Sequence, residues 1–412
     1  MSKHIIILAT ADTKGEECEF LRRQIISFGA TATLIDIGVM QDPEIEVDYA
    51  AANVASIAGA DLTDLRQQAS RQIASETMII GATKIVKELI ANQKADAIIG
   101  LGGTQGTSNC TSIMQQLPYG LPKIMVSTMA SGDVSAYVGV KDITMMFSVS
   151  DILGLNPFLR NILANAAGAA WGMACSDHKS ELGDNAIIVA ITNLGVLTRG
   201  TMHMIVLLKQ LGYQSMVFHA VGSGGEAMEQ MMRAGIIHAV IDYALGDICD
   251  AVLDGIRAAE PTRLTVAGEL GLPQVIIPGG IDHIGILLSD PAEMPEKYKN
   301  RLYSYHNPVI LVPRTSGSEM LQVMSSIAER LNSTTKDAVF MLPLQGVSSY
   351  SAQGGDLLDL KQDAIFNEAV KTMLPAHIPL IEMDNNAEDE EFVARAVAEM
   401  DNLIKQKAKD NL

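Results

Sequence analysis

The strongest constraint on the fold is an alternation of short, continuously apolar segments with longer amphipathic ones. The chain opens with HIIILAT, GEECEFLRRQIISFG and TATLIDIG, which predict a strand, a helix and a second strand. Strands that are apolar without alternation are buried on both faces, as in a parallel sheet with helices on both sides. The sequence therefore predicts an α/β protein.

The same pattern occurs a second time, because residues 185–222 repeat the order of strand, loop, helix, glycine and strand. A chain of 412 residues is also too long for one comfortable core. We expect two Rossmann-like, doubly wound, mainly parallel-sheet domains with a cleft between them. The predicted domains are 1–180 and 181–412, with the boundary in the polar segment 176–184.

Two further segments of the first half have counterparts in the second. KADAIIGLGG and GLPKIMVSTMASG correspond to GLPQVIIPGG and HNPVILVPRTSG, so each pair is expected to supply equivalent strands. The segment 151–175 is Ala-rich and apolar nearly all round, which predicts burial between the two halves or between subunits.

Charge and cysteine usage exclude several classes of protein. The net charge of −18 comes from 30 basic and 48 acidic side chains, and no basic cluster offsets it, so we expect no nucleic-acid partner. The four cysteines lie far apart without a CxxC pair, as in reduced cytosolic proteins. No signal peptide and no apolar window of membrane-spanning length is present. The prediction is a soluble, cytoplasmic protein without a membrane partner.

Ligands of open parallel sheets bind beyond the carboxyl ends of the strands, so the loops there are the candidate sites. The first such loop, ADTKG, carries Asp12, Thr13, Lys14 and Gly15. Lys14 is suited to a phosphate, and Asp12 to magnesium or water. The alternative is that Asp12 or Thr13 only caps the following helix.

The second loop, GLGGTQGT, follows a predicted buried strand and contains Gly100, Gly102, Gly103 and Gly106. Backbone amides of residues 104–107 are expected to hold an anion, with Thr104 and Thr107 donating to phosphate oxygens. The loop lacks the lysine of a P-loop, and Gln105 breaks a strict GxGxxG pattern. A tight turn without a ligand is the alternative.

The second half contains a formal dinucleotide fingerprint. Gly222, Gly224 and Ala227 give GxGxxA, Gly225 lies between them, and Asp242 follows about twenty residues later. This pattern supports an NAD(P)-dependent oxidoreductase as an alternative. The preceding strand is the second of its domain rather than the first, which weakens that alternative.

Polar residues at two other strand ends suggest an enzyme. Asp282 and His283 are neighbours suited to acid/base work or to a metal, and Arg314 is suited to a carboxylate or phosphate. In this hypothesis Glu226, Asp282 or His306 transfers protons, and Arg314 clamps a small carboxylate or phosphorylated metabolite. An ion pair inside the fold is the alternative role of Arg314.

Several motifs in order, including ILATADTKGEECEFLR, GLGGTQGT, GSGGEAME and PGGIDHI, resemble a family of bacterial and fungal proteins that shares the ATP-binding N-terminal half of a plant tobamovirus-resistance protein. The resemblance implies two Rossmann-like subdomains, binding of ATP with magnesium, and homodimers, and it leaves the reaction open. A non-catalytic, nucleotide-gated interaction protein is therefore a further alternative. The matching positions are Asp12, Thr13, Lys14, Gly15, Gly102, Gly103, Thr104, Gly106, Thr107, Gly222, Gly224, Gly225, Glu226, Asp282, His306, Arg314 and Glu319.

Overall fold

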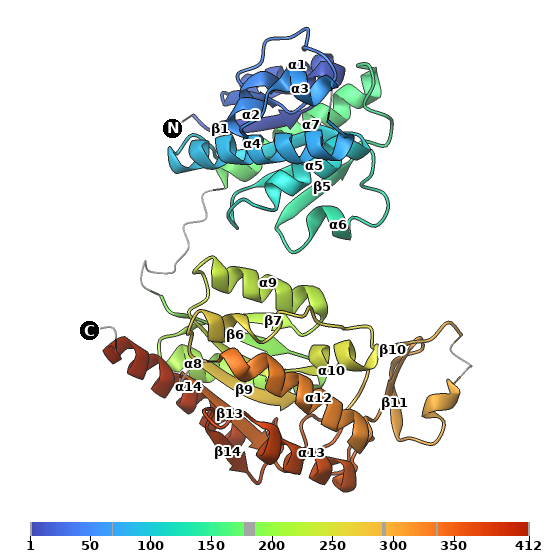
Figure 1. Cartoon of the computed structure of the whole chain (residues 1–412), viewed down its shortest axis with the longest axis vertical. Coiled ribbons are helices and arrows are strands. Elements are labelled where there is room, and N and C mark those ends of the chain that lie inside the picture. The colour runs from blue at the N-terminus through green and yellow to red at the C-terminus, as the bar shows by residue number, and fades with distance from the viewer. Residues whose placement is uncertain (1, 68, 177–185, 291–293, 335–336, 411–412) are drawn as a thin grey trace. The chain divides into compact units, whose positions relative to one another are not determined.

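The computed structural model describes residues 2–67, 69–176, 186–290, 294–334 and 337–410 (Figure 1). The chain forms two compact units, Met1–Ser180 (unit 1) and Glu181–Leu412 (unit 2). The predicted boundary segment lies outside the described residues, apart from Ser176. Each unit has its own sheet and its own buried core.

Unit 1 contains a five-stranded sheet in which all neighbouring strands are parallel. The order across the sheet is β2-β1-β3-β4-β5. The strands are β1 (His4–Ala9), β2 (Thr31–Asp36), β3 (Ala97–Gly102), β4 (Lys123–Ser127) and β5 (Ile143–Phe147).

Helices cover both faces of this sheet because successive strand residues point to opposite sides. Ile5 and Ile7 pack with helices α1 and α7, whereas Ile6 and Leu8 pack with α2, α4 and α5. The helices are α1 (Ala11–Ser27), α2 (Ala51–Ile57), α3 (Leu62–Gln67), α4 (Arg71–Ala91), α5 (Thr104–Met114), α6 (Ser135–Val138) and α7 (Pro157–Cys175).

The Ala-rich helix α7 belongs to the core of unit 1. Its buried residues, among them Leu163, Ala166 and Ala170, pack against strands β1, β3 and β4 within unit 1. Small side chains let the helix approach the sheet closely, and this packing explains the apolar composition. The helix is thus a core element of one unit.

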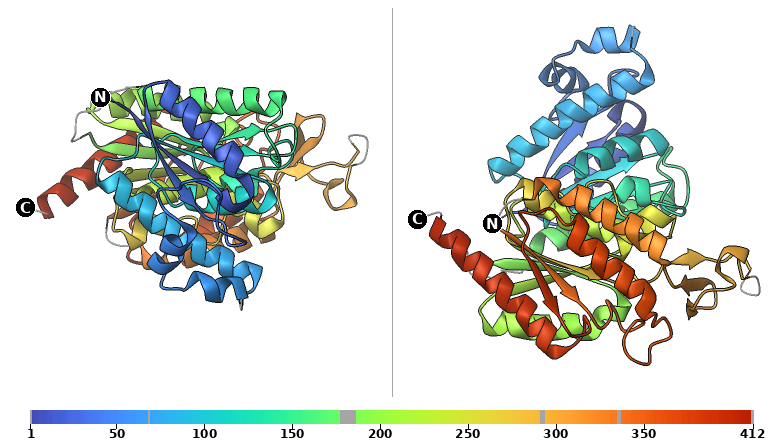
Figure 2. Two further views of the ribbon diagram at one scale, coloured as in Figure 1. Left: turned by 90° about the horizontal axis from the view of Figure 1, so that it is seen from above. Right: turned by 60° about the horizontal axis from the view of Figure 1, so that its bottom comes forward.

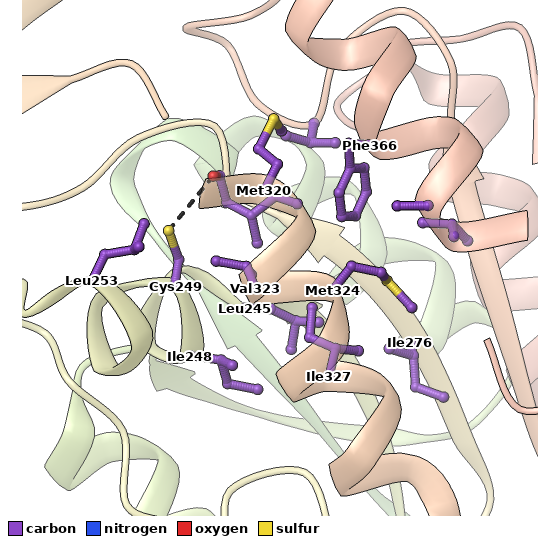
Figure 3. Packing of buried hydrophobic residues seen from close by; sticks show 14 of the residues in the cluster. Leu245, Ile248, Cys249, Leu253, Ile276, Met320, Val323, Met324, Ile327 and Phe366 are labelled. Atoms are coloured by element: carbon purple, nitrogen blue, oxygen red, sulfur yellow. Dashed lines mark hydrogen bonds between the residues drawn. The ribbon is translucent and has the colours of Figure 1, made fainter. Parts of the chain in front are cut away.

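Unit 2 contains a six-stranded parallel sheet in the order β14-β13-β9-β8-β6-β7. Helices α8 and α14 cover one face, and α10, α12 and α13 pack on the other through the cluster in Figure 3. The strands are β6 (Ile188–Asn193), β7 (Gln214–His219), β8 (Ala239–Ala244), β9 (Gln274–Gly279), β13 (Ala338–Pro343) and β14 (Leu380–Met383). The helices are η1 (Gly195–Leu197), α8 (Thr198–Gln210), α9 (Gly222–Arg233), α10 (Gly246–Leu253), α11 (Val266–Glu269), η2 (Glu296–Tyr298), α12 (Gly317–Arg330), η3 (Leu331–Ser333), α13 (Leu360–Met373) and α14 (Glu390–Asp410).

A small antiparallel sheet corrects the expectation for the segment HNPVILVPRTSG. It consists of β10 (Ile286–Leu287), β12 (Ile310–Pro313) and β11 (Tyr303–Asn307), and it extends from one side of unit 2 (Figures 1 and 2). The segment HNPVILVPRTSG therefore adds no strand to the parallel sheet. The chain reverses there because the Asn307 side chain accepts the amides of Val309 (3.0 Å) and Ile310 (2.9 Å).

Within the part of the chain that the structure describes, none of the helices has both the length and the apolar composition that a membrane span requires.

Candidate functional site

A pocket of about 360 Å³ lies at the carboxyl end of the unit 1 sheet. The chain runs from β1 to β2 on one side and then crosses to β3 on the other, so β1 and β3 form a topological switch point. Ligands of open parallel sheets bind at such points, between loops that leave the sheet in opposite directions. The loops after β1, β2 and β3 all line this pocket.

The first turn of α5 forms one wall of the pocket. Gly103 is its N-cap and provides no side-chain acceptor, and the first amide bonded within the helix is that of Thr107, which donates to the Gly103 carbonyl at 2.7 Å. Across the described ranges we find no acceptor for the amides of Thr104, Gln105 and Gly106. Free amides at a helix N-terminus, together with the helix dipole, attract anions.

The four glycines of this loop have two different roles. A Cβ at Gly100 would lie 2.6 Å from Met125 Sδ, and one at Gly102 would lie 2.7 Å from the Gly106 backbone. These two glycines let β3 and α5 pack together. Gly103 and Gly106 would meet nothing nearer than 3.9 and 3.6 Å, so their missing side chains leave room at the pocket itself.

The two threonines of the loop differ in the same way. Thr104 is exposed and lines the pocket, as predicted for a phosphate ligand. Thr107 is fully buried, and its hydroxyl contacts Ser127 Oγ at 2.6 Å and donates to the Gly102 carbonyl at 3.3 Å. The predicted contact of Thr107 with phosphate is therefore wrong, because its hydroxyl already bonds within the core.

The loop after β1 brings Asp12, Thr13 and Lys14 to the pocket. Helix α1 is broken at Lys14, where φ is −134° and ψ is 31°, and Lys14 Nζ donates to the Ile152 carbonyl at 2.8 Å. Gly15 lies outside the pocket lining, with Ile45 beside it.

Two carboxylates organise the base of this loop. Asp36 Oδ1 accepts the amides of Ala11 (2.9 Å) and Gly38 (2.8 Å), and Asp12 Oδ2 accepts that of Met40 (2.8 Å). Asp12 Oδ1 and Asp36 Oδ2 are buried without a hydrogen-bond partner among the described residues. Burial, together with the nearby charge of Asp12, raises the pKa of Asp36 to about 6, although the hydrogen bonds from the Gly38 and Ala11 amides lower it.

Arg71 and Asn109 line the pocket but were not predicted. Arg71 begins α4, is exposed, and forms no ion pair within the described ranges. Asn109 Oδ1 accepts from Ser75 Oγ (2.5 Å) and Gln105 Nε2 (2.9 Å), which fixes α4 against α5. The apolar part of the lining consists of Ile37, Val39, Met40, Ala74 and Met78. Gly38 and Thr10 also line the pocket.

The dinucleotide fingerprint of unit 2 is explained by packing. A Cβ at Gly222 would overlap the Ala258 carbonyl, one at Gly224 would overlap the His219 carbonyl, and one at Gly225 would lie 2.8 Å from Arg263. Asp242, expected to face a ribose in the oxidoreductase alternative, is buried and binds Arg263 at 2.6 Å. The structure therefore gives Asp242 no position from which to bind a ribose.

Two residues of the enzyme hypothesis also lie away from a ligand pocket. Arg314 is buried and donates to Asp363 (2.5 Å) and to the Asp282 carbonyl (3.0 Å), so its predicted role as a substrate clamp is wrong, because its guanidinium is bound inside the fold. Glu226 accepts from Gln230 on its own helix at 3.2 Å and lines neither pocket described here. Glu319 forms a capping box with Ser316.

Asp282 and His306 lie at a second pocket, in unit 2. Asp282 is fully buried behind it, with Oδ1 2.8 Å from His283 Nδ1, whereas His306 and His283 are part of its lining. Burial alone would raise the pKa of Asp282, but the hydrogen bonds from His283 and Ser348 and the charge of Arg314 hold it well below its ordinary value. Asp282 is thus a buried anion.

The fold and the first pocket together define a class: a two-unit, Rossmann-like α/β protein with a pocket at a topological switch point. The family comparison agrees with this architecture. The chain belongs to the uncharacterised protein family UPF0261, whose N-terminal domain matches residues 3–179 and whose C-terminal domain matches residues 186–404.

Relatives match nearly the whole chain. A UPF0261 protein of Clostridium tetani is 38% identical over 98% of this chain and 100% of its own length. The ToMV resistance protein Tm-1(GCR237) of Solanum lycopersicum is 30% identical over 90% of this chain, which corresponds to 52% of that protein. Among solved structures, MurG of Acinetobacter baumannii aligns over 97% of this chain and 95% of its own, at 11% identity and a TM-score of 0.21, which is too weak to carry an argument.

Proposed function

We propose that the protein binds ATP in the pocket of unit 1, with the phosphates against the first turn of α5. The observation that carries this proposal is the set of unbonded amides at Thr104, Gln105 and Gly106, beside two glycines that leave the backbone accessible. Phosphate groups bind at such helix N-termini in nucleotide-binding folds. The switch-point position supports the same ligand class.

The charges around the pocket fit a polyphosphate. Lys14 and Arg71 are the basic residues of the lining, and Arg71 has no acidic partner within the described ranges, so its charge is available to a ligand. A chain with a net charge of −18 needs such local cations to hold an anion. Lys14 would be anchored by the Ile152 carbonyl while its charge acts on the phosphates.

The unpartnered Oδ1 of Asp12 fits magnesium. Buried carboxylate oxygens without a donor are costly, and a cation satisfies them. The described residues contain no group of three or more His, Cys, Asp or Glu suited to a metal, which agrees with an ion held by one protein carboxylate together with phosphates. Bound there, magnesium would neutralise phosphate charge.

The apolar part of the pocket lining suits a nucleobase. Val39, Ala74 and Met78 provide apolar surface from the β2 loop and α4. An apolar wall facing a few fixed polar groups is typical of small-molecule sites. The resemblance of the ADTKG and GLGGTQGT loops to the ATP-binding half of a tobamovirus-resistance protein further supports ATP.

Thermal unfolding with ATP, ADP, NAD and NADP, each with and without magnesium, tests the proposal. Fluorescence of Trp171 reports unit 1, because this single tryptophan lies on α7 and stacks on Phe28. A ligand at 100 times its Kd stabilises by about 2.7 kcal/mol. We expect stabilisation by ATP, strengthened by magnesium, and none by NAD or NADP; stabilisation by NAD alone would contradict the proposal.

A pair of variants on α4 locates the site. Arg71→Gln removes the unpaired cation at the pocket, and we expect ATP to bind about 10-fold more weakly, the effect of one charged hydrogen bond. Lys87→Gln removes an exposed lysine from the same helix, outside the pocket lining, and should leave the Kd unchanged. Equal effects of both variants would mean that the response is only a general charge effect.

Phosphate release measured on the same samples distinguishes hydrolysis from nucleotide-gated binding.

A further inference from the structure

The second pocket lies at the equivalent position of unit 2. Strand β6 is flanked by β7 and β8, so the chain changes direction at β6, as it does at β1 in unit 1. A pocket of about 490 Å³ opens beyond the carboxyl ends of β6, β7, β9 and β13, with further residues from the antiparallel sheet. This volume is typical of small-molecule sites.

The polar lining of this pocket is basic or neutral. Among the described residues it includes Arg257, three histidines (His219, His283 and His306), Tyr350 and Ser349, and no acidic residue. In a chain with 48 acidic side chains, a described lining without any of them favours an anionic ligand. Burial, followed by the charge of Asp356, raises the pKa of Tyr350, so its phenol stays a hydrogen-bond donor.

A buried network holds Arg257 in place at this pocket. Its guanidinium binds Asp250 through Nε and Nη2, both at 2.8 Å, and Nη1 donates to His283 Nε2 at 3.0 Å. Because an arginine only donates, His283 Nε2 is an acceptor, and Nδ1 carries the proton that binds Asp282. Ser348 donates to the other oxygen of Asp282 at 2.5 Å.

The network leaves one donor for a ligand. Nη2 also donates to the His283 carbonyl at 3.2 Å, so one hydrogen of Arg257 Nη1 has no acceptor among the described residues. His219 Nδ1 donates to the Asn193 carbonyl at 3.1 Å, so Nε2 donates to a ligand only in the protonated imidazole, the form that a bound carboxylate favours. His306 is exposed, and none of the described residues hydrogen-bonds to its ring. A fixed guanidinium with two adjustable imidazoles is suited to one carboxylate.

Much of the remaining lining is apolar. The first amide of α9, at Gly222, donates to the Arg257 carbonyl at 3.0 Å, so this amide is not open to a ligand. Aliphatic side chains, among them Val196, Ile256, Ile310 and Val312, form the remaining surface. We propose that this pocket binds a small organic acid, whose carboxylate contacts Arg257 and the imidazoles of His219 and His306 and whose apolar body contacts these aliphatic side chains.

Titration of ¹³C-histidine-labelled full-length protein at pH 7, followed by imidazole NMR signals, tests this. The probes are hexanoate, benzoate, hexanamide and inorganic phosphate, and single His→Gln variants assign the signals. We expect an acid to shift the signals of His219 and His306 in a saturable way, with the signal of the exposed His377 unchanged. Hexanamide and phosphate should cause no saturable shift.

Variants of two histidines show whether the acid binds in this pocket. His306→Gln should weaken the binding of the acid about 10-fold, because one hydrogen bond to a charged group is lost, whereas His377→Gln should not change it. Equal binding of hexanamide or phosphate would overturn the proposal, and so would no saturation by either acid at about 10 mM, the weak end of specific affinity. Arg71→Gln should leave acid binding unaffected, so this result is independent of the nucleotide proposal.

Discussion

Replacement of Asp36 by asparagine should change the pH dependence of the stability of unit 1. Both hydrogen bonds that Asp36 accepts go to Oδ1, from Ala11 and Gly38, and the buried Oδ2 has no partner in the described structure. Asparagine keeps the accepting oxygen and places an amide where Oδ2 lies, near the carboxylate of Asp12. The variant therefore removes a buried negative charge and keeps the bonds that hold the loops.

The size of the effect follows from the raised pKa of Asp36. Burial raises it from 3.8 to about 6 in the folded protein, so ionisation is harder in the folded than in the unfolded state. The stability contributed by the neutral carboxyl is complete below pH 3.8 and is lost as the pH rises to about 6. The two pKa values correspond to about 3 kcal/mol in total, of which about 2 kcal/mol falls between pH 4.5 and pH 7.5.

Urea unfolding followed by Trp171 fluorescence measures this in unit 1 alone. Asp36→Asn should be more stable than the parent protein at pH 7.5, and this advantage should shrink by about 2 kcal/mol at pH 4.5. Taking the difference between the two proteins removes the other titrating groups. A difference that is the same at both pH values would refute the reasoning, because Asp36 would then ionise normally in the fold.

Three further predictions concern packing and accessibility. Gly102→Ala places a Cβ 2.7 Å from the Gly106 backbone and should lower the unfolding free energy of unit 1 by about 1–3 kcal/mol. Gly103→Ala should leave the unfolding free energy unchanged and weaken ATP binding. Equal losses of stability in the two variants would contradict the different roles of these glycines. Arg263→Met leaves two carboxylates unpaired in the core of unit 2 and should cost about 3–5 kcal/mol in urea unfolding; a cost below about 1 kcal/mol would contradict this. A thiol reagent should label only Cys175 in the native protein and all four cysteines in urea. The other three cysteines are buried, and burial raises the pKa values of their thiols. Rapid labelling of a second thiol in the native protein would contradict this prediction.

The positions of strands were predictable where an apolar run fits only a buried strand of a parallel sheet. HIIILAT and KADAIIGLGG became β1 and β3, and the loops after them form the pocket, because strand ends in a parallel sheet fix where ligand loops gather. The prediction that HNPVILVPRTSG supplies a strand of the parallel sheet was wrong, because its apolar run is equally compatible with an antiparallel strand. The turn at Asn307 makes the strand antiparallel by pairing β12 with β11, and this pairing is a tertiary property.

The sequence predicted which loops line the pocket better than it predicted which side chains face it. Sequence spacing predicts which loop carries a polar group but not the side to which the group points, so Thr104 faces the pocket while Thr107 bonds to Ser127. Arg71 is the first residue of α4 and lies more than twenty residues before β3 begins, so no local pattern links it to the loop after β3. Arg257 likewise depends on partners from two other segments, Asp250 and His283. Such long-range pairings were not predictable from one sequence.

The most direct test of the nucleotide site is a crystal structure with magnesium and a non-hydrolysable ATP analogue. The account predicts nucleotide density in the unit 1 pocket, with phosphate oxygens at the amides of Thr104 to Gly106 and Arg71 turned toward them. Density at the Gly222 turn, or an empty unit 1 pocket at saturating analogue, would contradict it.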